Sequence, residues 1–337
     1  MNTKTEHNAH QFIQQFLPHK SPARHQGQGQ APVNIALGKY WGKRNTALNL
    51  PMNSSLSISL PSLGTQTQIQ YHQSSNQTND HIQLNHQPLP PQHPFAKRIS
   101  QFLDLFRPNP QDTFSVLTHN SVPTGAGLAS SASGYAALVL ALEDLFQWGL
   151  NRQQLSILAR IGSGSASRSL FKGFAIWHKG TKADGSDSFA QAIDTRWPEL
   201  RIGLIKIDLT EKAIGSTLGM QNTVNHCPLY QAWPQQAEKD VQTLQTAIQT
   251  QDFTLLGKTA EHNALNMHAT MIATWPPILY WQSQSITAMQ KVWQLRQTGL
   301  EVYFTMDAGP NLKLIFQQKD AEKLQTEFKT MDIIQVF

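Results

Sequence analysis

Several short segments of the chain alternate apolar and polar residues, a pattern that predicts β-strands buried on one face. In NSSLSISL, residues 53–60, aliphatic side chains alternate with serines at the period of two that a half-buried strand requires. Further strands are expected over residues 114–122, 201–209, 301–306 and 313–316, and in the C-terminal segment DIIQVF. Strands are therefore predicted in both halves of the sequence.

Other segments repeat apolar residues at a spacing of three and four, which predicts amphipathic helices. Residues 135–146 show this spacing directly after a glycine- and serine-rich segment. Asn151 and Gln154 together have the pattern of a capping box, which predicts that a second helix begins there. Long helical segments are expected over residues 230–271 and 278–298, with one more helix before the last strand.

The order of these elements predicts an α+β protein with two domains. The pattern restarts after residue 197, so the first domain is expected to span residues 31–197 and the second, of ferredoxin-like character, residues 198–337. Residues 1–30 are rich in Gln and His, end in QGQGQ and are predicted to form a flexible arm with one short helical patch. Residues 71–94 are polar and end in prolines, which predicts a hairpin tip and a loop.

Composition and charge narrow the classes of protein to which the chain can belong. Its 337 residues are 39% hydrophobic and 15% charged, a balance typical of a globular protein. No apolar run approaches the roughly 20 residues that span a bilayer, and no secretory signal is recognisable, so a cytoplasmic protein without a membrane partner is expected. The formal charge of +5 is scattered along the chain, which argues against a nucleic-acid partner. The single cysteine, Cys227, excludes an internal disulfide.

One glycine- and serine-rich segment has the composition of a phosphate-binding loop. In PTGAGLASSASG, residues 123–134, Gly125 and Gly127 allow backbone N–H groups to converge on an anion. Ser130 and Ser131 then begin a helix, and a helix N-terminus favours phosphate. The segment is not a Walker A loop, because no Lys-Ser or Lys-Thr follows its last glycine. An ordinary turn before a helix is the alternative interpretation.

A second segment of this kind surrounds a single cation. In IGSGSASRS, residues 161–169, small residues flank Arg168 and leave space for a ligand. A guanidinium binds a carboxylate or a phosphate through two parallel hydrogen bonds. A surface turn is the alternative for this segment taken alone.

A third segment concentrates positive charge. NIALGKYWGKRN, residues 34–45, places Lys39, Lys43 and Arg44 close together, with a tyrosine and a tryptophan between them. Three cations at this spacing repel one another unless an anion lies between them. The segment therefore predicts a ligand with several negative charges, the alternative being a solvated basic turn.

One carboxylate occupies a position that suits a general base. Asp307 follows the apolar strand in VYFTMDAGPN and precedes an Ala-Gly-Pro-Asn turn. A carboxylate there can be held rigidly and partly desolvated, as a general base requires. Aspartate also opens turns by binding its own backbone, so position alone favours neither interpretation.

Taken together, these segments resemble the diphosphomevalonate decarboxylase family, a branch of the small-molecule kinases that includes galactokinase, homoserine kinase and mevalonate kinase. The matching motifs lie between residues 31 and 316. They are NIALGKYWGKRN with LPMNSSLSISL, PTGAGLASSASGYAAL, GSGSASRSLFKGF, ADGSDSFA with WPEL, GSTLGMQNT, HNALNMHATM with WPPILY, and FTMDAGPN. The chain departs from the family pattern at Gly38, where a bulkier apolar residue is usual, and at Ser167, where cysteine is common.

The resemblance implies a fold and a reaction. The fold has an N-terminal domain like the second domain of ribosomal protein S5, a ferredoxin-like C-terminal domain, and a cleft between them. In the reaction, ATP phosphorylates the C3 hydroxyl of mevalonate 5-diphosphate, and phosphate and CO₂ then leave to give isopentenyl diphosphate, in the mevalonate pathway of isoprenoid biosynthesis. ATP and Mg²⁺ are implied as co-substrate and cofactor, and a homodimer is the expected assembly.

The resemblance also implies roles for individual residues. The implied catalytic residues are Asp307, Lys39 and Arg168. The implied substrate contacts are Asn34, Tyr40, Lys43, Ser163, Ser165, Arg168 and Ser216. The implied ATP site comprises Pro123, Thr124, Gly125, Ala126, Gly127, Leu128, Ala129, Ser130 and Ser131. Ser131 is the candidate contact for Mg²⁺, and no dedicated metal site is expected, because the 13 histidines are dispersed without the spacing of metal ligands.

Alternatives of two classes stay open from the sequence. A phosphomevalonate decarboxylase or a mevalonate 3-kinase would share the fold. Asp307 argues against a pure kinase, and the cations of residues 34–45 favour the diphosphate over the monophosphate as substrate. A basic nucleic-acid-binding protein would show binding to oligonucleotides that depends steeply on salt. The enzyme predicts ATP turnover that depends on mevalonate 5-diphosphate.

Overall fold

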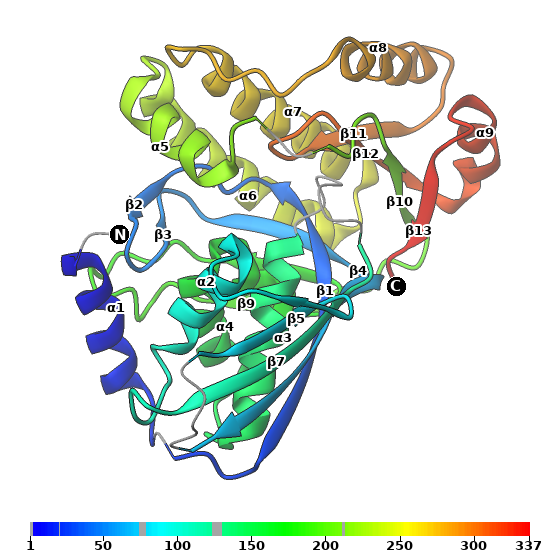
Figure 1. Cartoon of the computed structure of the whole chain (residues 1–337). Helices are drawn as coiled ribbons and strands as arrows, with labels where there is room; N and C mark the ends of the chain where they lie inside the picture. The colour runs from blue at the N-terminus through cyan, green and yellow to red at the C-terminus, as the bar shows by residue number, and fades with distance from the viewer. Residues whose placement is uncertain (1–2, 20, 74–78, 123–129, 211–212) are drawn as a thin grey trace.

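Two β-sheets form the framework of the protein (Figure 1). The structure is a computed structural model and describes residues 3–19, 21–73, 79–122, 130–210 and 213–337. Within these residues, the larger sheet has seven strands in the order β6-β5-β7-β4-β8-β9, and β1 pairs with β4. Its strands are β1 (Gln26–Gly38), β4 (Ser55–His72), β5 (His81–Leu84), β6 (Gln87–Leu89), β7 (Thr113–Asn120), β8 (Phe174–Trp177) and β9 (Ala190–Ile193).

The long strand β4 is the centre of this sheet. It pairs antiparallel with β1, β7 and β8. The strand predicted over residues 53–60 is confirmed from Ser55 onwards, and it continues to His72. Its register against β1 shifts between Pro32 and Val33. The hairpin expected within residues 71–94 is formed by β5 and β6.

Helices cover the larger sheet and its edge. The predicted helix over residues 135–146 is α3 (Ser130–Phe146), which packs against β1 and β4. The predicted capping box of Asn151 and Gln154 begins α4 (Arg152–Gly162). The helix α2 (Pro94–Leu103) was not predicted from the sequence, and its Pro94 stands in the first turn, where proline is well tolerated.

The N-terminal residues differ from the flexible arm that their composition predicts. Residues 26–30, QGQGQ, form the first part of β1 rather than a loose segment. A Cβ atom at Gly29 would lie 2.2 Å from the carbonyl oxygen of Ala137 in α3, so glycine is required for this close contact. Before β1, α1 (Thr3–Phe16) contributes Ile13 to the same hydrophobic core, and the indole of Trp148 donates to the carbonyl of His19 at 3.0 Å.

The second sheet confirms the ferredoxin-like prediction. Its order is β11-β12-β10-β13, and all neighbouring strands are antiparallel, which is the arrangement of a ferredoxin-like fold. Its strands are β10 (Leu200–Ile205), β11 (Val302–Met306), β12 (Leu312–Gln317) and β13 (Asp332–Gln335). Its helices are α5 (Ser216–His226), α6 (Trp233–Thr250), α7 (Phe253–Ile272), α8 (Ser283–Gln297) and α9 (Ala321–Glu327).

The long helix expected over residues 230–271 is divided in two. Gln251 takes a left-handed conformation with φ of 53°, which ends α6. The side chain of Asp252 then accepts a hydrogen bond from the backbone N–H of Leu255 and begins α7. The helix α5 was also missed, because its apolar pattern is weak. None of the described helices is long and apolar enough to cross a membrane.

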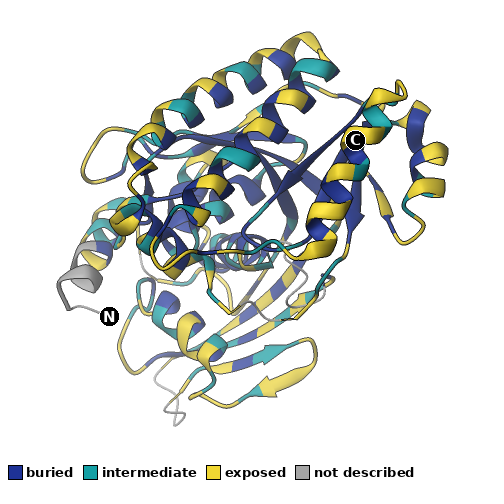
Figure 2. Ribbon diagram, turned by 90° about the horizontal axis from the view of Figure 1, so that it is seen from above, coloured by how far each residue is buried: buried dark blue, intermediate teal, exposed yellow. Residues whose placement is uncertain are grey.

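The two sheets share one hydrophobic core where they meet. Val33 and Ile35 of β1 pack in the same cluster as Val241 and Leu244 of α6. A Cβ atom at Gly38 would lie 2.8 Å from a methyl carbon of Val241, which explains why a bulkier residue is absent there. Figure 2 shows the buried residues concentrated on the strands and on the inner faces of the helices. This shared core fixes the position of the C-terminal domain against β1 and β4.

The contact between β1 and α3 can be tested by one substitution. Gly29→Ala is expected to lower the free energy of unfolding by about 2 kcal/mol, because its Cβ overlaps the backbone of α3. Gly134→Ala in α3 is the control, since a Cβ there meets nothing within 4 Å and alanine favours a helix by about 1 kcal/mol. Urea denaturation measures both changes, and equal stabilities of the two variants would contradict the close contact.

Candidate active site

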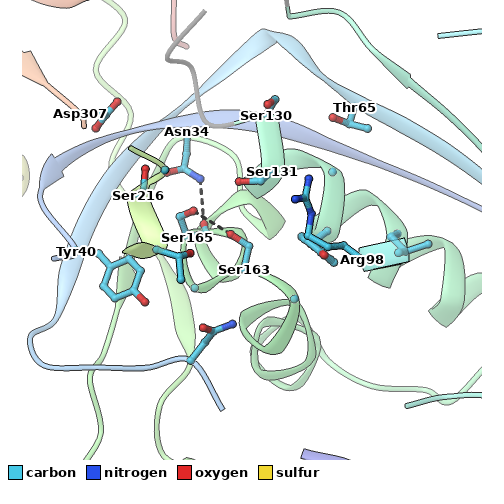
Figure 3. A pocket seen from close by; sticks show the side chains of 18 of the residues that line it. Asn34, Tyr40, Thr65, Arg98, Ser130, Ser131, Ser163, Ser165, Ser216 and Asp307 are labelled. Carbon is cyan, nitrogen blue, oxygen red and sulfur yellow. Dashed lines mark hydrogen bonds between the residues drawn. The ribbon is translucent and has the colours of Figure 1, made fainter. Parts of the chain in front are cut away.

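A cavity of about 910 Å³ lies between the two domains. Every described residue that the sequence assigned to catalysis, substrate or ATP lines it, namely Asn34, Lys39, Tyr40, Lys43, Ser130, Ser131, Ser163, Ser165, Arg168, Ser216 and Asp307. In Figure 3, Asp307 lies at one end of the group of side chains and Arg98 at the other, with the serines between them. Residues 123–129 of the predicted ATP site lie outside the described residues.

Asp307 is held between two lysines. It follows β11 and faces Lys39 at the end of β1, with 2.9 Å between Lys39 Nζ and Asp307 Oδ1. Lys313 of β12 approaches the other oxygen, with 3.2 Å between its Nζ and Oδ2. Both lysine side chains are only 2% exposed, whereas Asp307 keeps 25% of its side-chain surface exposed. The two buried lysines therefore fix the carboxylate, and its remaining exposed surface is open towards the cavity.

These contacts set the charge of the carboxylate. Burial alone would raise the pKa of Asp307, but the charges and hydrogen bonds of Lys39 and Lys313 outweigh it and hold that pKa well below its usual range. Burial also lowers the pKa of Lys39 to about 8, although Asp307 opposes this change. The sequence predicted a rigid carboxylate, and the structure adds that it is a weak base.

Backbone contacts hold Lys39 in place. Its N–H donates to Asn263 Oδ1 at 2.7 Å, and its carbonyl accepts from Asn53 Nδ2 at 2.7 Å. Its Nζ also donates to the carbonyl of Ala36 at 2.7 Å. Because Asn263 belongs to α7 and Asn53 to the segment before β4, both domains position this ammonium group.

A neutral histidine supports the backbone of Asp307. His268 Nε2 lies 3.1 Å from the carbonyl oxygen of Asp307, and its ring stacks on Trp281 at a centroid distance of 5.1 Å. Burial and the nearby charge of Lys39 lower the pKa of His268 to about 3. The ring is therefore neutral at ordinary pH and donates its Nε2–H to the carbonyl.

Arg168 is a buried cation aimed at the same cavity. Its side chain donates to Ser55 Oγ and, at 3.4 Å, to Asn34 Oδ1, and among the described residues its Nε has no hydrogen-bond partner. Burial lowers its pKa to about 10, so the guanidinium remains charged at neutral pH. Burying a cation without a bound carboxylate is costly, which favours an anionic ligand at this place.

Serine and amide groups lie beside Arg168. Asn34 Nδ2 donates to Ser169 Oγ at 2.7 Å and to the carbonyl of Ser165 at 3.2 Å. Ser163 Oγ and Ser165 Oγ are 3.4 Å apart (Figure 3). These hydroxyls face the cavity and can bind an anion together with the guanidinium.

Tyr40 and Lys43 occupy another wall of the cavity. The hydroxyl of Tyr40 is buried and has no hydrogen-bond partner among the described residues, and its ring packs against Trp177 at 4.8 Å. Lys43 Nζ donates to Asn49 Oδ1 at 2.6 Å. Burial lowers the pKa of Lys43 to about 8. The sequence grouped Arg44 with these cations, but Arg44 does not line the cavity and instead donates to backbone carbonyls of the segment after β8.

Positive charges outnumber negative charges in the cavity. Among its described lining residues, the cations are Lys39, Lys43, Arg98 and Arg168, and the one carboxylate is Asp307. The N-terminal ends of α3 and α5 also line it, and a helix N-terminus carries partial positive charge. Such a cavity suits a ligand or pair of ligands with several negative charges.

Family models match both halves of the chain. The model of the diphosphomevalonate decarboxylase-like N-terminal domain matches residues 31–190, and that of the mevalonate 5-diphosphate decarboxylase C-terminal domain matches residues 204–334. The chain belongs to the diphosphomevalonate decarboxylase family.

Relatives and solved structures of this decarboxylase family agree in sequence and fold. The diphosphomevalonate decarboxylase of Aspergillus fumigatus is 36% identical over 321 residues, which cover 89% of this chain and 79% of that relative. A structure of the mevalonate diphosphate decarboxylase from Enterococcus faecalis is 40% identical, covers 92% of this chain and 96% of that one, and has a TM-score of 0.85. A complex with MVAPP, AMPPCP and magnesium is 41% identical over the same shares of the two chains, with a TM-score of 0.85.

The sequence missed several residues of this decarboxylase site. Lys313 lies in an apolar strand and Asn49 in a turn, and no local motif distinguishes these two residues, whereas His268 lies in the middle of α7. The HNALNMHATM segment, which contains Asn263 and His268, was a recognised family motif and carried the one signal that could have identified them.

The contact of Lys313 with the carboxylate can be measured directly. Lys313→Met is expected to raise the pKa of Asp307 by about one pH unit or more, because one of two neighbouring cations is removed. Carboxyl ¹³C chemical shifts over a pH titration report this change. Lys319→Met removes an exposed lysine that pairs with Glu301 and serves as the control. Identical titrations of Asp307 in both variants would contradict the contact.

Proposed function

We propose that the chain catalyses the ATP-dependent decarboxylation of mevalonate 5-diphosphate to isopentenyl diphosphate, with release of ADP, phosphate and CO₂. Membership of the decarboxylase family supports this proposal, and so do related structures that contain MVAPP with a nucleotide analogue and magnesium. The observation that carries it is the carboxylate of Asp307, fixed by Lys39 and Lys313 and open to a cavity of surplus positive charge.

The two anionic ends of the substrate have separate binding groups in this proposal. Arg168 holds the carboxylate of mevalonate 5-diphosphate, with Asn34 and the serines of residues 163–165 beside it. Tyr40 and Lys43 bind the diphosphate, and Ser216 at the start of α5 adds a hydroxyl. The hydroxyl of Tyr40 and the Nε of Arg168 are buried without a described protein partner, which leaves both groups with unused hydrogen-bonding capacity beside the cavity.

The nucleotide occupies the side of the cavity formed by α3. Ser130 and Ser131 begin this helix, whose N-terminus favours phosphate, and we assign the preceding residues 123–129 to the same ATP site. Ser131 offers a hydroxyl oxygen, the kind of ligand that Mg²⁺ prefers beside phosphate oxygens and water. Bound Mg²⁺ would neutralise charge on the phosphate groups of ATP.

In the first step, the C3 hydroxyl attacks the γ-phosphoryl group of ATP. The C3 oxygen forms a bond to phosphorus, the bond from that phosphorus to ADP breaks, and the hydroxyl loses its proton. Asp307 is too weak a base to remove this proton early, because its pKa is held low. It accepts the hydrogen bond of the hydroxyl and orients it. In a loose phosphoryl-transfer transition state the proton leaves late and passes to a non-bridging oxygen of the transferred phosphoryl group. Lys39, which contacts Asp307 and lines the cavity, is the cation that would stabilise the transferred phosphate.

In the second step, phosphate and CO₂ leave. The bond between C3 and the phosphate oxygen breaks, and positive charge develops at C3. The bond between C1 and C2 breaks, and its electron pair forms the double bond between C2 and C3 as CO₂ departs. The ionised Asp307 stabilises the developing charge, and Arg168 keeps the carboxylate in the plane that decarboxylation requires.

One assay separates this proposal from the enzymes nearest to it. Purified protein is given ATP, Mg²⁺ and either mevalonate, its 5-phosphate or its 5-diphosphate, and ADP and CO₂ are measured together. Formation of both with the diphosphate alone supports the proposal. ADP without CO₂ would identify a 3-kinase, and preference for the monophosphate would identify a phosphomevalonate decarboxylase.

We further propose that the enzyme is a cytoplasmic homodimer in which residues 31–197 carry the ATP site and residues 198–337 carry Asp307. Homodimers are the commonest assembly of soluble enzymes. Sedimentation measures the assembly, and limited proteolysis of the intact enzyme tests the boundary.

The role of the carboxylate predicts a large effect of a small change. Asp307→Asn is expected to lower kcat by at least about 10³-fold, because the uncharged amide keeps the shape but is a poorer acceptor for the hydrogen bond of the hydroxyl and does not stabilise positive charge at C3. ATP affinity, measured with a fluorescent nucleotide, should be nearly unchanged. Turnover close to that of the unaltered enzyme would remove the proposed role of Asp307.

The two lysines predict a decline of activity in mildly alkaline solution. The pKa of Lys39 and that of Lys43 are both lowered to about 8, so each is an ammonium below this pH and loses its charge above it. We therefore expect kcat/KM for mevalonate 5-diphosphate to fall as pH rises through about 8, because the diphosphate loses the charge of Lys43 and the transferred phosphoryl group loses that of Lys39. Lys43→Met should show a shallower fall. A profile that stays flat well above this pH contradicts the prediction.

A further inference from the structure

Asn49 makes three hydrogen bonds that connect the cavity to the end of a helix. It lies between β2 (Lys43–Asn45) and β3 (Leu50–Pro51) and is 9% exposed. Its Oδ1 accepts from Lys43 Nζ at 2.6 Å. Its Nδ2 donates to the carbonyl of Arg160 at 3.0 Å and to that of Ile161 at 2.8 Å, in the last turn of α4.

These partners permit only one orientation of the amide. Rotating it by half a turn would direct the NH₂ group at the ammonium of Lys43 and the oxygen at the two carbonyls. Donors would then face donors and acceptors would face acceptors. The side chain of Asn49 is thereby fixed, and so is the acceptor that it offers to Lys43.

The amide also completes the end of α4. The last carbonyls of a helix have no partners within the helix, and Asn49 supplies two of the missing donors. A second hydrogen bond joins α4 to the same turn, since Arg160 Nε donates to the carbonyl of Leu48 at 3.0 Å. Ser163, one of the assigned substrate contacts, caps this helix. The turn that carries Asn49 is thus hydrogen-bonded to the end of α4, where the segment of residues 161–169 that contains Arg168 begins.

Lysine needs such support more than most side chains. Its four-carbon chain has many rotamers, and among the described residues Asn49 Oδ1 is the hydrogen-bond acceptor that the structure gives to Lys43 Nζ. A carboxylate at this position would neutralise the ammonium and repel an anionic ligand. A neutral amide oxygen fixes the ammonium and leaves its charge available. Asparagine also tolerates the φ of 50° found here.

We propose that Asn49 is a positioning residue that holds the ammonium of Lys43 towards the diphosphate of the substrate. This inference rests on the proposed role of Lys43 in binding the diphosphate. Asn49 itself acts through Lys43, and it aligns Lys43 with the end of α4 and therefore with Ser163.

The kinetic test uses variants that remove the amide without straining the backbone. Asn49→Gly is expected to raise KM for mevalonate 5-diphosphate about tenfold, as for loss of a hydrogen bond to a charged group, with little change in kcat or in KM for ATP. Asn49→Asp should raise the same KM, because its carboxylate neutralises Lys43. In a double-mutant cycle, adding Asn49→Gly to Lys43→Met should have little further effect on KM.

A matched control separates the positioning of Lys43 from the general effect of placing a glycine in a turn. Gln251→Gly removes a side chain at φ of 53° in the turn between α6 and α7, outside the cavity lining, and should leave both KM values unchanged. A second readout needs no substrate. In ¹³C NMR titrations, Asn49→Gly should lower the pKa of Lys43, because it removes the oxygen that accepts from the ammonium group. Asn49→Asp should raise that pKa, because it replaces the neutral acceptor by a negatively charged carboxylate.

The outcomes distinguish this inference from the function on which it rests. If Lys43→Met raises KM for the diphosphate substrate but Asn49→Gly does not, positioning by Asn49 is overturned and the decarboxylase assignment stands. If Lys43→Met changes no kinetic constant while turnover continues, the diphosphate role of Lys43 is wrong, and the inference fails with it. An unchanged pKa of Lys43 in both Asn49 variants would overturn the contact independently of activity.

Discussion

The site depends on one ion cluster, in which the carboxylate of Asp307 lies between the ammonium groups of Lys39 and Lys313. Lys39 comes from the first domain, whereas Asp307 and Lys313 come from adjacent strands of the second. The cluster therefore forms only when the two domains are correctly docked. Removing the carboxylate would leave two buried ammonium groups without their shared anion, which costs far more than an exposed ion pair contributes.

This cluster also bears on both steps of the proposed reaction, phosphoryl transfer and decarboxylation. A carboxylate beside two cations remains ionised, so it cannot hold a proton, but it can face a centre that becomes positive. In the proposed mechanism Lys39 faces the transferred phosphate and Asp307 the reacting carbon, so the contact between Lys39 and Asp307 couples the two groups. Phosphoryl transfer and decarboxylation can thus share one set of residues, because the second step creates the charge for which Asp307 is suited.

Local motifs indicated the candidate reacting residues, and tertiary contacts bring the other groups of the cavity to them. Asp307 and Arg168 stand in recognisable segments, so sequence alone indicated both. Lys313 reaches the carboxylate only because β12 pairs with β11, and a single lysine in an apolar strand carries no such information. The β-conformation of QGQGQ depends on close packing against α3, which residue propensity does not reveal. The break at Gln251 likewise has no strong local signal, because glutamine is a good helix former.

The common core of the two domains limits how this enzyme can open. Side chains of β1 and β4 pack in one continuous cluster with those of α6 and α7, so separating the domains as rigid bodies would expose a large apolar surface to water. A hinge motion of the kind seen in many kinases is therefore energetically disfavoured. Entry of the nucleotide and exit of isopentenyl diphosphate must rely on local rearrangement at the rim of the cavity, and crystals grown with and without ligands should retain the same angle between the domains.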